Sequence, residues 1–294
     1  MPPRAVQAAA ALLALVALAG CSELLSTAPT ATAAAERCID VPGDAAGLAW
    51  SPTGRYLAVG TVDPAGVKAA QVLDTSGDGP TTAVIEREML PETVVTSVDG
   101  QLAWISAGAT GRQLVVNQPD GMRFTVLPDE VVGLGWTAIG YALLEHPAAG
   151  GSRVLIADID RPADPNEIHR TDLTVARLWI AADREIMVLS IAHPDHRDAP
   201  VSFQVVGAEE TQELEPPGAD ASGASMPALR RWLVYRSAST SRMEAVPVDD
   251  PDAVVTLVDR AARRGMISDG GMLAYVPVEP ANQVCLVDVA AELP

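Results

Sequence analysis

The chain has 294 residues, of which 20 are basic and 38 are acidic, so its formal net charge at pH 7 is −18. A surface this acidic repels phosphate backbones and anionic lipid headgroups, which disfavours nucleic-acid binding. Hydrophobic residues make up 48% of the chain, enough to build a sizeable core. We therefore expect a folded domain without a nucleic-acid partner.

The N-terminus predicts a secretory signal. A basic start at Arg4 precedes an uncharged stretch, residues 5–19, that is too short for a permanent membrane span. The motif Leu18-Ala19-Gly20-Cys21 resembles the lipobox of bacterial lipoproteins, with Cys21 at the lipidated position. The resemblance implies cleavage before Cys21 and a diacylglyceryl anchor in the bilayer, at the extracytoplasmic face of a cell membrane. An ordinary secretory signal with an incidental cysteine is the alternative.

Three segments follow from this interpretation. Residues 1–20 are the predicted lipoprotein signal peptide, and residues 21–36, rich in Ser, Thr, Ala and Pro, are a predicted flexible tether. Residues 37–294 form the predicted folded domain. This domain contains no apolar run of the roughly eighteen residues that a spanning helix needs.

Apolar hairpins recur along the domain at intervals of about 40 to 47 residues, the spacing of propeller blades. The first unit sets the pattern, because Pro52-Thr53-Gly54 makes a tight turn between two short strands. Helical patterning is limited to residues 260–264, which are too few for a stable helix. A seven-bladed ring would require splitting the fourth unit. Six units are predicted, at residues 47–85, 94–127, 132–169, 176–214, 226–258 and 265–289.

The sixth unit has only three strands, and an unassigned strand at residues 37–41 precedes the first unit. Pairing this strand with residues 284–289 would close the ring and hide two exposed edges. It would also bring Cys38 near Cys285, the two cysteines that remain once Cys21 carries lipid. We therefore predict a disulfide between them, with two separate buried thiols as the alternative.

The segment Trp50-Ser-Pro-Thr-Gly-Arg-Tyr-Leu-Ala58 is similar to the W-S-P-D-G-x-x-L-A repeat of TolB-like and other WD40-like β-propellers. Thr53 stands where Asp is usual, and weaker copies occur at residues 268–275 and 98–104. The resemblance implies an all-β, six-bladed β-propeller closed by its N-terminal strand. It does not imply a function, because this fold is used by both enzymes and binding proteins.

Histidines and carboxylates suggest two metal sites. His193 and His196, with Asp195 and Asp198, are predicted to lie in a connection between blade strands, and His146 in the corresponding connection of the preceding unit, so a metal site there is geometrically possible. Pro194 between two of the histidines is equally typical of a polar surface loop. Asp158, Asp160, Asp164 and Asn166 offer oxygen ligands for calcium, but the segment lacks the glycine of an EF-type loop. We assign no metal ligand from these patterns.

Two further residue classes are conspicuous. Arg260, Arg263 and Arg264 form a basic cluster on the predicted connection into the sixth unit, where they either receive a partner's carboxylate or balance acidic neighbours. Five tryptophans recur near the first hairpins of their units, where packing between neighbouring blades accounts for them better than sugar stacking. They are Trp50, Trp104, Trp136, Trp179 and Trp232.

The sequence contains no Gly-x-Ser-x-Gly, His-Glu-x-x-His, P-loop or dinucleotide motif, so we assign no catalytic residue and no cofactor. The prediction is a lipid-anchored scaffold lipoprotein whose propeller binds a protein or a cell-envelope component. The alternative is a propeller hydrolase, lactonase or lyase with a metal in its central channel. Convergence of His146, His193, His196 and Asp63 would favour the enzyme.

Overall fold

The structure is a computed structural model that describes residues 35–77, 80–159, 161–191, 201–227 and 231–293. The predicted signal peptide, Cys21 and most of the predicted tether lie outside these residues, so they remain predictions. Within the described part, no helix has the length and hydrophobicity that crossing a membrane requires.

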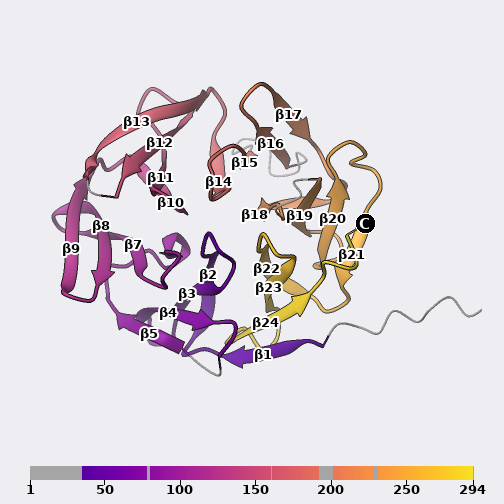
Figure 1. Cartoon of the computed structure of the whole chain (residues 1–294), viewed down its shortest axis with the longest axis horizontal. Helices are drawn as coiled ribbons and strands as arrows, with labels where there is room; N and C mark the ends of the chain where they lie inside the picture. The colour runs from indigo at the N-terminus through magenta and orange to yellow at the C-terminus, as the bar shows by residue number, and fades with distance from the viewer. Residues whose placement is uncertain (1–34, 78–79, 160, 192–200, 228–230, 294) are drawn as a thin grey trace, which may run out of the picture. The chain divides into compact units, whose positions relative to one another are not determined.

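The folded unit is all-β, with six four-stranded antiparallel sheets, or blades, arranged in a ring (Figure 1). Blades 1 to 3 are formed by β2 (Asp44–Trp50), β3 (Tyr56–Val62), β4 (Lys68–Asp74) and β5 (Pro80–Ile85); β6 (Val95–Thr96), β7 (Leu102–Gly108), β8 (Gly111–Gln118) and β9 (Gly121–Leu127); and β10 (Val131–Thr137), β11 (Gly140–Glu145), β12 (Ser152–Asp158) and β13 (Arg161–Thr171). Blades 4 and 5 are formed by β14 (Val175–Ile180), β15 (Met187–Ile191), β16 (Ser202–Val206) and β17 (Thr211–Leu214); and β18 (Ala219–Ser225), β19 (Trp232–Ser237), β20 (Met243–Pro247) and β21 (Val255–Val258).

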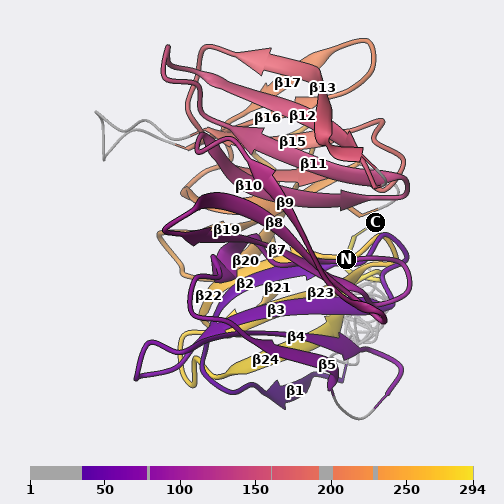
Figure 2. The same ribbon diagram turned by 90° about the vertical axis from the view of Figure 1, so that its left-hand side faces the viewer.

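Blade 6 confirms the predicted closure of the ring. It contains β22 (Ala262–Ile267), β23 (Met272–Pro277), β24 (Gln283–Asp288) and, beside β24, the N-terminal strand β1 (Arg37–Asp40). Both views place β1 along β24 (Figures 1 and 2). In the register of this pair Cys38 lies opposite Cys285, and the two form a disulfide across 247 residues of sequence.

The hydrophobic core lies between the blades. Each buried cluster combines side chains from two neighbouring sheets, because each strand face must be covered by the next blade. Between blades 6 and 1, for example, Val276 and Leu286 pack with Leu57 and Val59. The buried faces therefore hold neighbouring blades at a fixed distance and leave their first strands around the centre of the ring.

The link from blade 1 to blade 2 folds back onto the inner hairpin of blade 1. Gly47 and Gly60 are register partners, and a Cβ atom on either would lie 2.0 Å from the carbonyl oxygen of Pro91 in the short 3₁₀ helix η1 (Pro91–Thr93). Thr93 Oγ1 accepts a hydrogen bond from Ile105 N at 2.9 Å, which ties η1 to blade 2. Glycine at both positions therefore permits this close backbone approach.

One predicted strand is wrong, and the predicted start of another is too late. The first strand of blade 5 is β18, whereas the sequence indicated residues 226–229, of which 228 and 229 lie outside the described residues. β18 consists of Ala, Ser, Gly and Asp, so it has no apolar pattern that would predict a strand. The first large buried apolar residue, Met226, comes directly after it, where the predicted strand began. β22 begins earlier than the predicted residue 265, so Arg263 and Arg264 lie within a strand instead of a connection.

Candidate functional site in the central channel

A cavity of about 60 Å³ opens between strands from blades 1, 4, 5 and 6. Its walls come from β2, β14, β18 and β22, which lie around the centre of the ring (Figure 1). The lining combines two arginines, Arg177 and Arg264, with the apolar Leu48 and Met266 and the polar Ser222. The ring thus brings side chains that are far apart in sequence into one central channel.

Arg264 is a half-buried cation with incomplete hydrogen bonding. Its Nη1 donates a hydrogen bond to the carbonyl oxygen of Ala46, but its buried Nε has no hydrogen-bond partner among the described residues. Burial lowers the pKa of Arg264, and the positive charge of Arg177 lowers it further, while Glu92 opposes the shift. A guanidinium remains protonated in proteins, so Arg264 is a desolvated positive charge at neutral pH.

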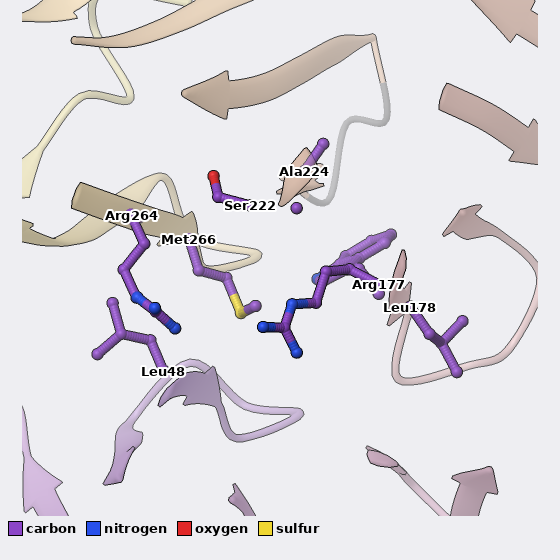
Figure 3. Close-up of a pocket in the computed structure, with 10 residues that line it drawn as sticks. Leu48, Arg177, Leu178, Ser222, Ala224, Arg264 and Met266 are labelled. Atoms are coloured by element: carbon purple, nitrogen blue, oxygen red, sulfur yellow. The ribbon is translucent and has the colours of Figure 1, made fainter. Parts of the chain in front are cut away.

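Arg177 approaches the same space from the opposite wall. Figure 3 shows the guanidinium of Arg264, from β22, and that of Arg177, from β14, extending toward each other with Met266 between them. Neither group forms an ion pair within the part of the chain that the structure describes. Two like charges therefore share a small central cavity, an arrangement that a bound anion would stabilise.

An aromatic cavity of about 30 Å³ adjoins the arginine cavity, and Trp179 lines both. Trp50 and Trp136 also line it, and Trp50 Nε1 donates to the carbonyl oxygen of Met266 at 2.9 Å. These three tryptophans lie at or near the ends of the first strands of their blades. Because this is the same position in each repeat, the sequence could have indicated that they lie close together. The fully buried Trp104 lies on a second strand, with its indole nitrogen bonded to Glu86, and fits the predicted role in blade packing.

The predicted basic cluster separates into three environments. Arg263 pairs with Asp44 at 3.2 Å, as expected for a charge that balances an acidic neighbour. Arg260 lies beside the disulfide, where Nη1 is 3.7 Å from Cys285 Sγ. Arg264 alone enters the channel cavity. Consecutive strand residues point to opposite sides of a sheet, which explains why Arg263 and Arg264 diverge.

Comparisons with known proteins identify the architecture. No family model and no curated protein matches the chain. Among solved structures, TolB from Acinetobacter baumannii matches with a TM-score of 0.53 and 10% identity over 86% of this chain, which spans 54% of the TolB chain. The Cps50 (Swd1) β-propeller domain of Myceliophteria thermophila matches with a TM-score of 0.51 and 12% identity, covering 87% of this chain and all of that one (100%). The domain is a six-bladed β-propeller.

A third likeness is to an enzyme. Oligogalacturonate lyase from Vibrio parahaemolyticus matches the propeller with a TM-score of 0.55 and 8% identity, over 87% of this chain and 92% of the lyase. The identities are low, so these likenesses establish the fold alone. TolB and WD40-type propellers are among the structural neighbours, in agreement with the family resemblance of the repeat motif.

The propeller does not gather the described members of the predicted histidine site. His146 Nε2 is hydrogen-bonded to the carbonyl oxygen of Val175 at 2.8 Å, and Asp63 accepts bonds at 2.8 Å from the amides of Ala65 and Val67 within its own turn. His193 and His196 lie outside the described residues. In the described part, the one group of three His, Cys, Asp or Glu ligand atoms is Glu36, Cys38 and Cys285, whose sulfurs form the disulfide.

The predicted calcium segment forms part of a hairpin. Asp158 ends β12, and Asn166 pairs with Ile156 in the middle of β13. Asp164 also lies in β13, while Asp160 is outside the described residues. Asp158, Asp164 and Asn166 therefore lie in two paired strands and not in a loop that curves around an ion, so they are not arranged as they would be in a calcium-binding loop.

Proposed function

We propose that this protein is a lipid-anchored binding protein whose propeller channel receives an anionic group of a protein or cell-envelope partner. The observation that carries this proposal is the buried Nε of Arg264, which has no hydrogen-bond partner among the described residues, on a guanidinium that faces that of Arg177 across the channel cavity. A buried guanidinium N–H without a hydrogen-bond partner is costly. A bound carboxylate or phosphate would accept a hydrogen bond from this Nε and would offset the repulsion between the two arginines.

The ligand chemistry follows from the size and composition of the site. A guanidinium binds a planar carboxylate or a phosphate through two parallel hydrogen bonds. A cavity of about 60 Å³ has room for roughly four water molecules, which matches one acidic group. The neighbouring surface of Trp50, Trp136 and Trp179 would hold the apolar part of the same ligand. We therefore expect the partner to insert one acidic side chain or acidic sugar.

The same charges disfavour the enzyme alternative with a metal in the channel. Two guanidinium groups repel a divalent cation, which usually sits among carboxylates and imidazoles. In addition, His146 and Asp63 are engaged elsewhere in the described part of the propeller. A binding role therefore fits the channel better than metal-assisted hydrolysis.

The channel proposal is tested with an acidic peptide of defined length. Hexaglutamate is added to the protein while tryptophan fluorescence and titration calorimetry report binding, with hexaglutamine as the uncharged comparison. Arg264→Gln and Arg177→Gln should each weaken hexaglutamate binding by about tenfold or more, since each loses a charge-assisted hydrogen bond. Arg263→Gln is the matched control and should bind like the wild type, because Arg263 pairs with Asp44 outside the cavity. Equal binding of hexaglutamine, or unchanged binding by both channel variants, would refute the proposal.

The anchor is tested separately. Cys21 supplies the thiol to which the diacylglyceryl group would be attached, and the tether would hold the propeller close to the bilayer. Cys21→Ala should move the protein from the membrane fraction to the soluble fraction, whereas Ser22→Ala should leave it membrane-bound. Membrane retention of the Cys21→Ala protein would contradict the anchor without affecting the channel proposal.

A further inference from the structure

The disulfide that closes the propeller has one accessible side. Cys38 lies in the exposed strand β1, whereas Cys285 is fully buried (0% exposed) in β24. An external thiol would therefore reach the bond at the sulfur of Cys38. Attack on that sulfur makes the buried Cys285 the leaving group.

A positive charge lies beside both sulfurs. Arg260 Nη1 is 3.8 Å from Cys38 Sγ and 3.7 Å from Cys285 Sγ. The guanidinium is held there by a hydrogen bond of 2.9 Å from Nη2 to the carbonyl oxygen of Glu279 and by an ion pair of 3.9 Å with Glu36. A neighbouring cation favours a thiolate over a thiol, and a better-stabilised leaving thiolate speeds thiol–disulfide exchange. The Glu36 carboxylate, within 4.8 Å of both sulfurs, opposes this effect in part.

We propose that Cys38–Cys285 is a thiol–disulfide exchange site for a dithiol reductant, with Cys38 as the attacked residue and Arg260 as the group that stabilises the departing Cys285 thiolate. The site lies at the closing strand, and this inference does not depend on anion binding in the channel. The geometry assigns the attacked sulfur because only Cys38 is an exposed residue, which leaves Cys285 as the departing thiolate, with Arg260 Nη1 at 3.7 Å from its sulfur.

The exchange balances as a two-electron reduction. A thiolate of the dithiol forms a bond to Cys38 Sγ, the Cys38–Cys285 bond breaks, and its electron pair moves to Cys285. The second thiol of the reductant then loses its proton and attacks the reductant's first sulfur, which is bonded to Cys38 in the mixed disulfide. This attack releases Cys38 as a thiolate. The reductant leaves as a disulfide, and its two protons pass to solvent or to the two cysteines.

Reduction would act on the strand that leads into the predicted tether. β1 has only four residues, and besides its pairing with β24 it is held by contacts such as Gln283 Nε2 to Asp40 at 2.9 Å and Arg37 to the carbonyl oxygen of Thr75 at 3.0 Å. These bonds lie near the surface and are exposed to water. Loss of the cross-link would therefore free β1 more readily than any inner strand, and blades 1 to 5 would remain folded.

The first experiment locates the attacked sulfur. The oxidised full chain is incubated with reduced glutathione without denaturant, quenched with acid, and digested for peptide mass spectrometry. Glutathione is expected on Cys38. Glutathione on Cys285, or no adduct until the protein is unfolded by denaturant, would overturn the proposal.

The second experiment tests the role of Arg260. Reduction by dithiothreitol is followed by alkylation of the released thiols, and circular dichroism verifies that each variant is folded. Arg260→Gln should slow reduction by about threefold or more, and Arg260→Lys should restore the rate to within about twofold, because it keeps the charge. Arg263→Gln should match the wild type. An equal or faster rate in Arg260→Gln would show that Arg260 only supports the local structure, contrary to the proposal.

Discussion

Tyr141 illustrates how packing between blades controls the charge of a single residue. It is 1% exposed, lies in the core cluster between blades 2 and 3, and contacts Trp136 of its own blade, with ring centroids 5.0 Å apart. Burial raises the pKa of Tyr141 from 10.0 to about 12. Because the folded state holds the proton more tightly, the stabilisation is complete below pH 10 and is lost as the pH rises toward 12. Between pH 10 and pH 12 we expect Tyr141 to lower the free energy of unfolding by roughly 2 kcal/mol, measured by urea unfolding.

The matched variants for this prediction are Tyr141→Phe and Tyr56→Phe. Tyr141→Phe removes the titrating hydroxyl, so its unfolding free energy should fall less between pH 10 and pH 12 than that of the wild type. Tyr56 is only partly buried, with Arg55 over its ring at 4.9 Å. The unfolding free energy of Tyr56→Phe should therefore fall between pH 10 and pH 12 as much as that of the wild type. Burial also raises the pKa of Tyr235, and some loss should persist in both variants. Identical pH dependence in all three proteins would contradict the assignment to Tyr141.

The channel arginines show what a sequence does not reveal at the scale of a residue. Composition and spacing identified Arg260, Arg263 and Arg264 as one cluster, but strand alternation and the early start of β22 give each a different neighbour. Arg177 carries no sequence signal, since a single basic residue in a strand is ordinary. It becomes notable only because the ring places it opposite Arg264.

At the scale of elements, strands with strong turn signals could be predicted and strands of small residues could not. The hairpin of β2 and β3 follows from Pro52-Thr53-Gly54, and that of β22 and β23 follows from Asp269-Gly270. β18 lacks an apolar pattern because it lies next to the channel and carries Ala, Ser and Gly. Its register with β19 also shifts between Ala219 and Ala224, so alternation fails there.

Polar contacts compensate for the weak hydrophobic signal of β18. Arg236 on β19 forms an ion pair with Asp220 on β18 and donates from Nε to the carbonyl oxygen of Ala262 on β22 at 2.6 Å. The two paired side chains are only 20% and 19% exposed. We predict that Arg236→Met leaves Asp220 without its counter-charge and lowers the free energy of unfolding by about 2 to 3 kcal/mol, measured in urea.

An exposed ion pair provides the comparison for that prediction. Arg55 and Asp74 are 2.8 Å apart, but the side chain of Arg55 is 57% exposed. Solvent screens such a pair, so Arg55→Met should cost much less than Arg236→Met. Equal losses in the two variants would show that the Arg236 network does not hold β18 in place.

At the scale of the whole molecule, the closed ring could be predicted and the contents of its channel could not. A three-stranded last unit, one spare N-terminal strand and two remaining cysteines all indicated the contact between β1 and β24. The channel walls instead come from four blades, and no local pattern records which side chains meet across the axis. Packing between blades sets the geometry of the ring, and this geometry determines which side chains face one another across the channel.

The Cys38–Cys285 cross-link stabilises the ring as a whole. A disulfide that spans 247 residues restricts the unfolded chain strongly, and the chain-entropy model gives it about 5 kcal/mol. We expect the double variant Cys38→Ala/Cys285→Ala to melt roughly 10 °C or more below the oxidised wild type by scanning calorimetry. The control is the reduced wild type, alkylated at Cys38. It should melt close to the double variant, because both proteins lack the disulfide. Since their side chains at these positions differ, a similar melting temperature would assign the effect to the lost cross-link. An unchanged melting temperature in the double variant would mean that packing and the β1–β24 hydrogen bonds alone keep the propeller closed.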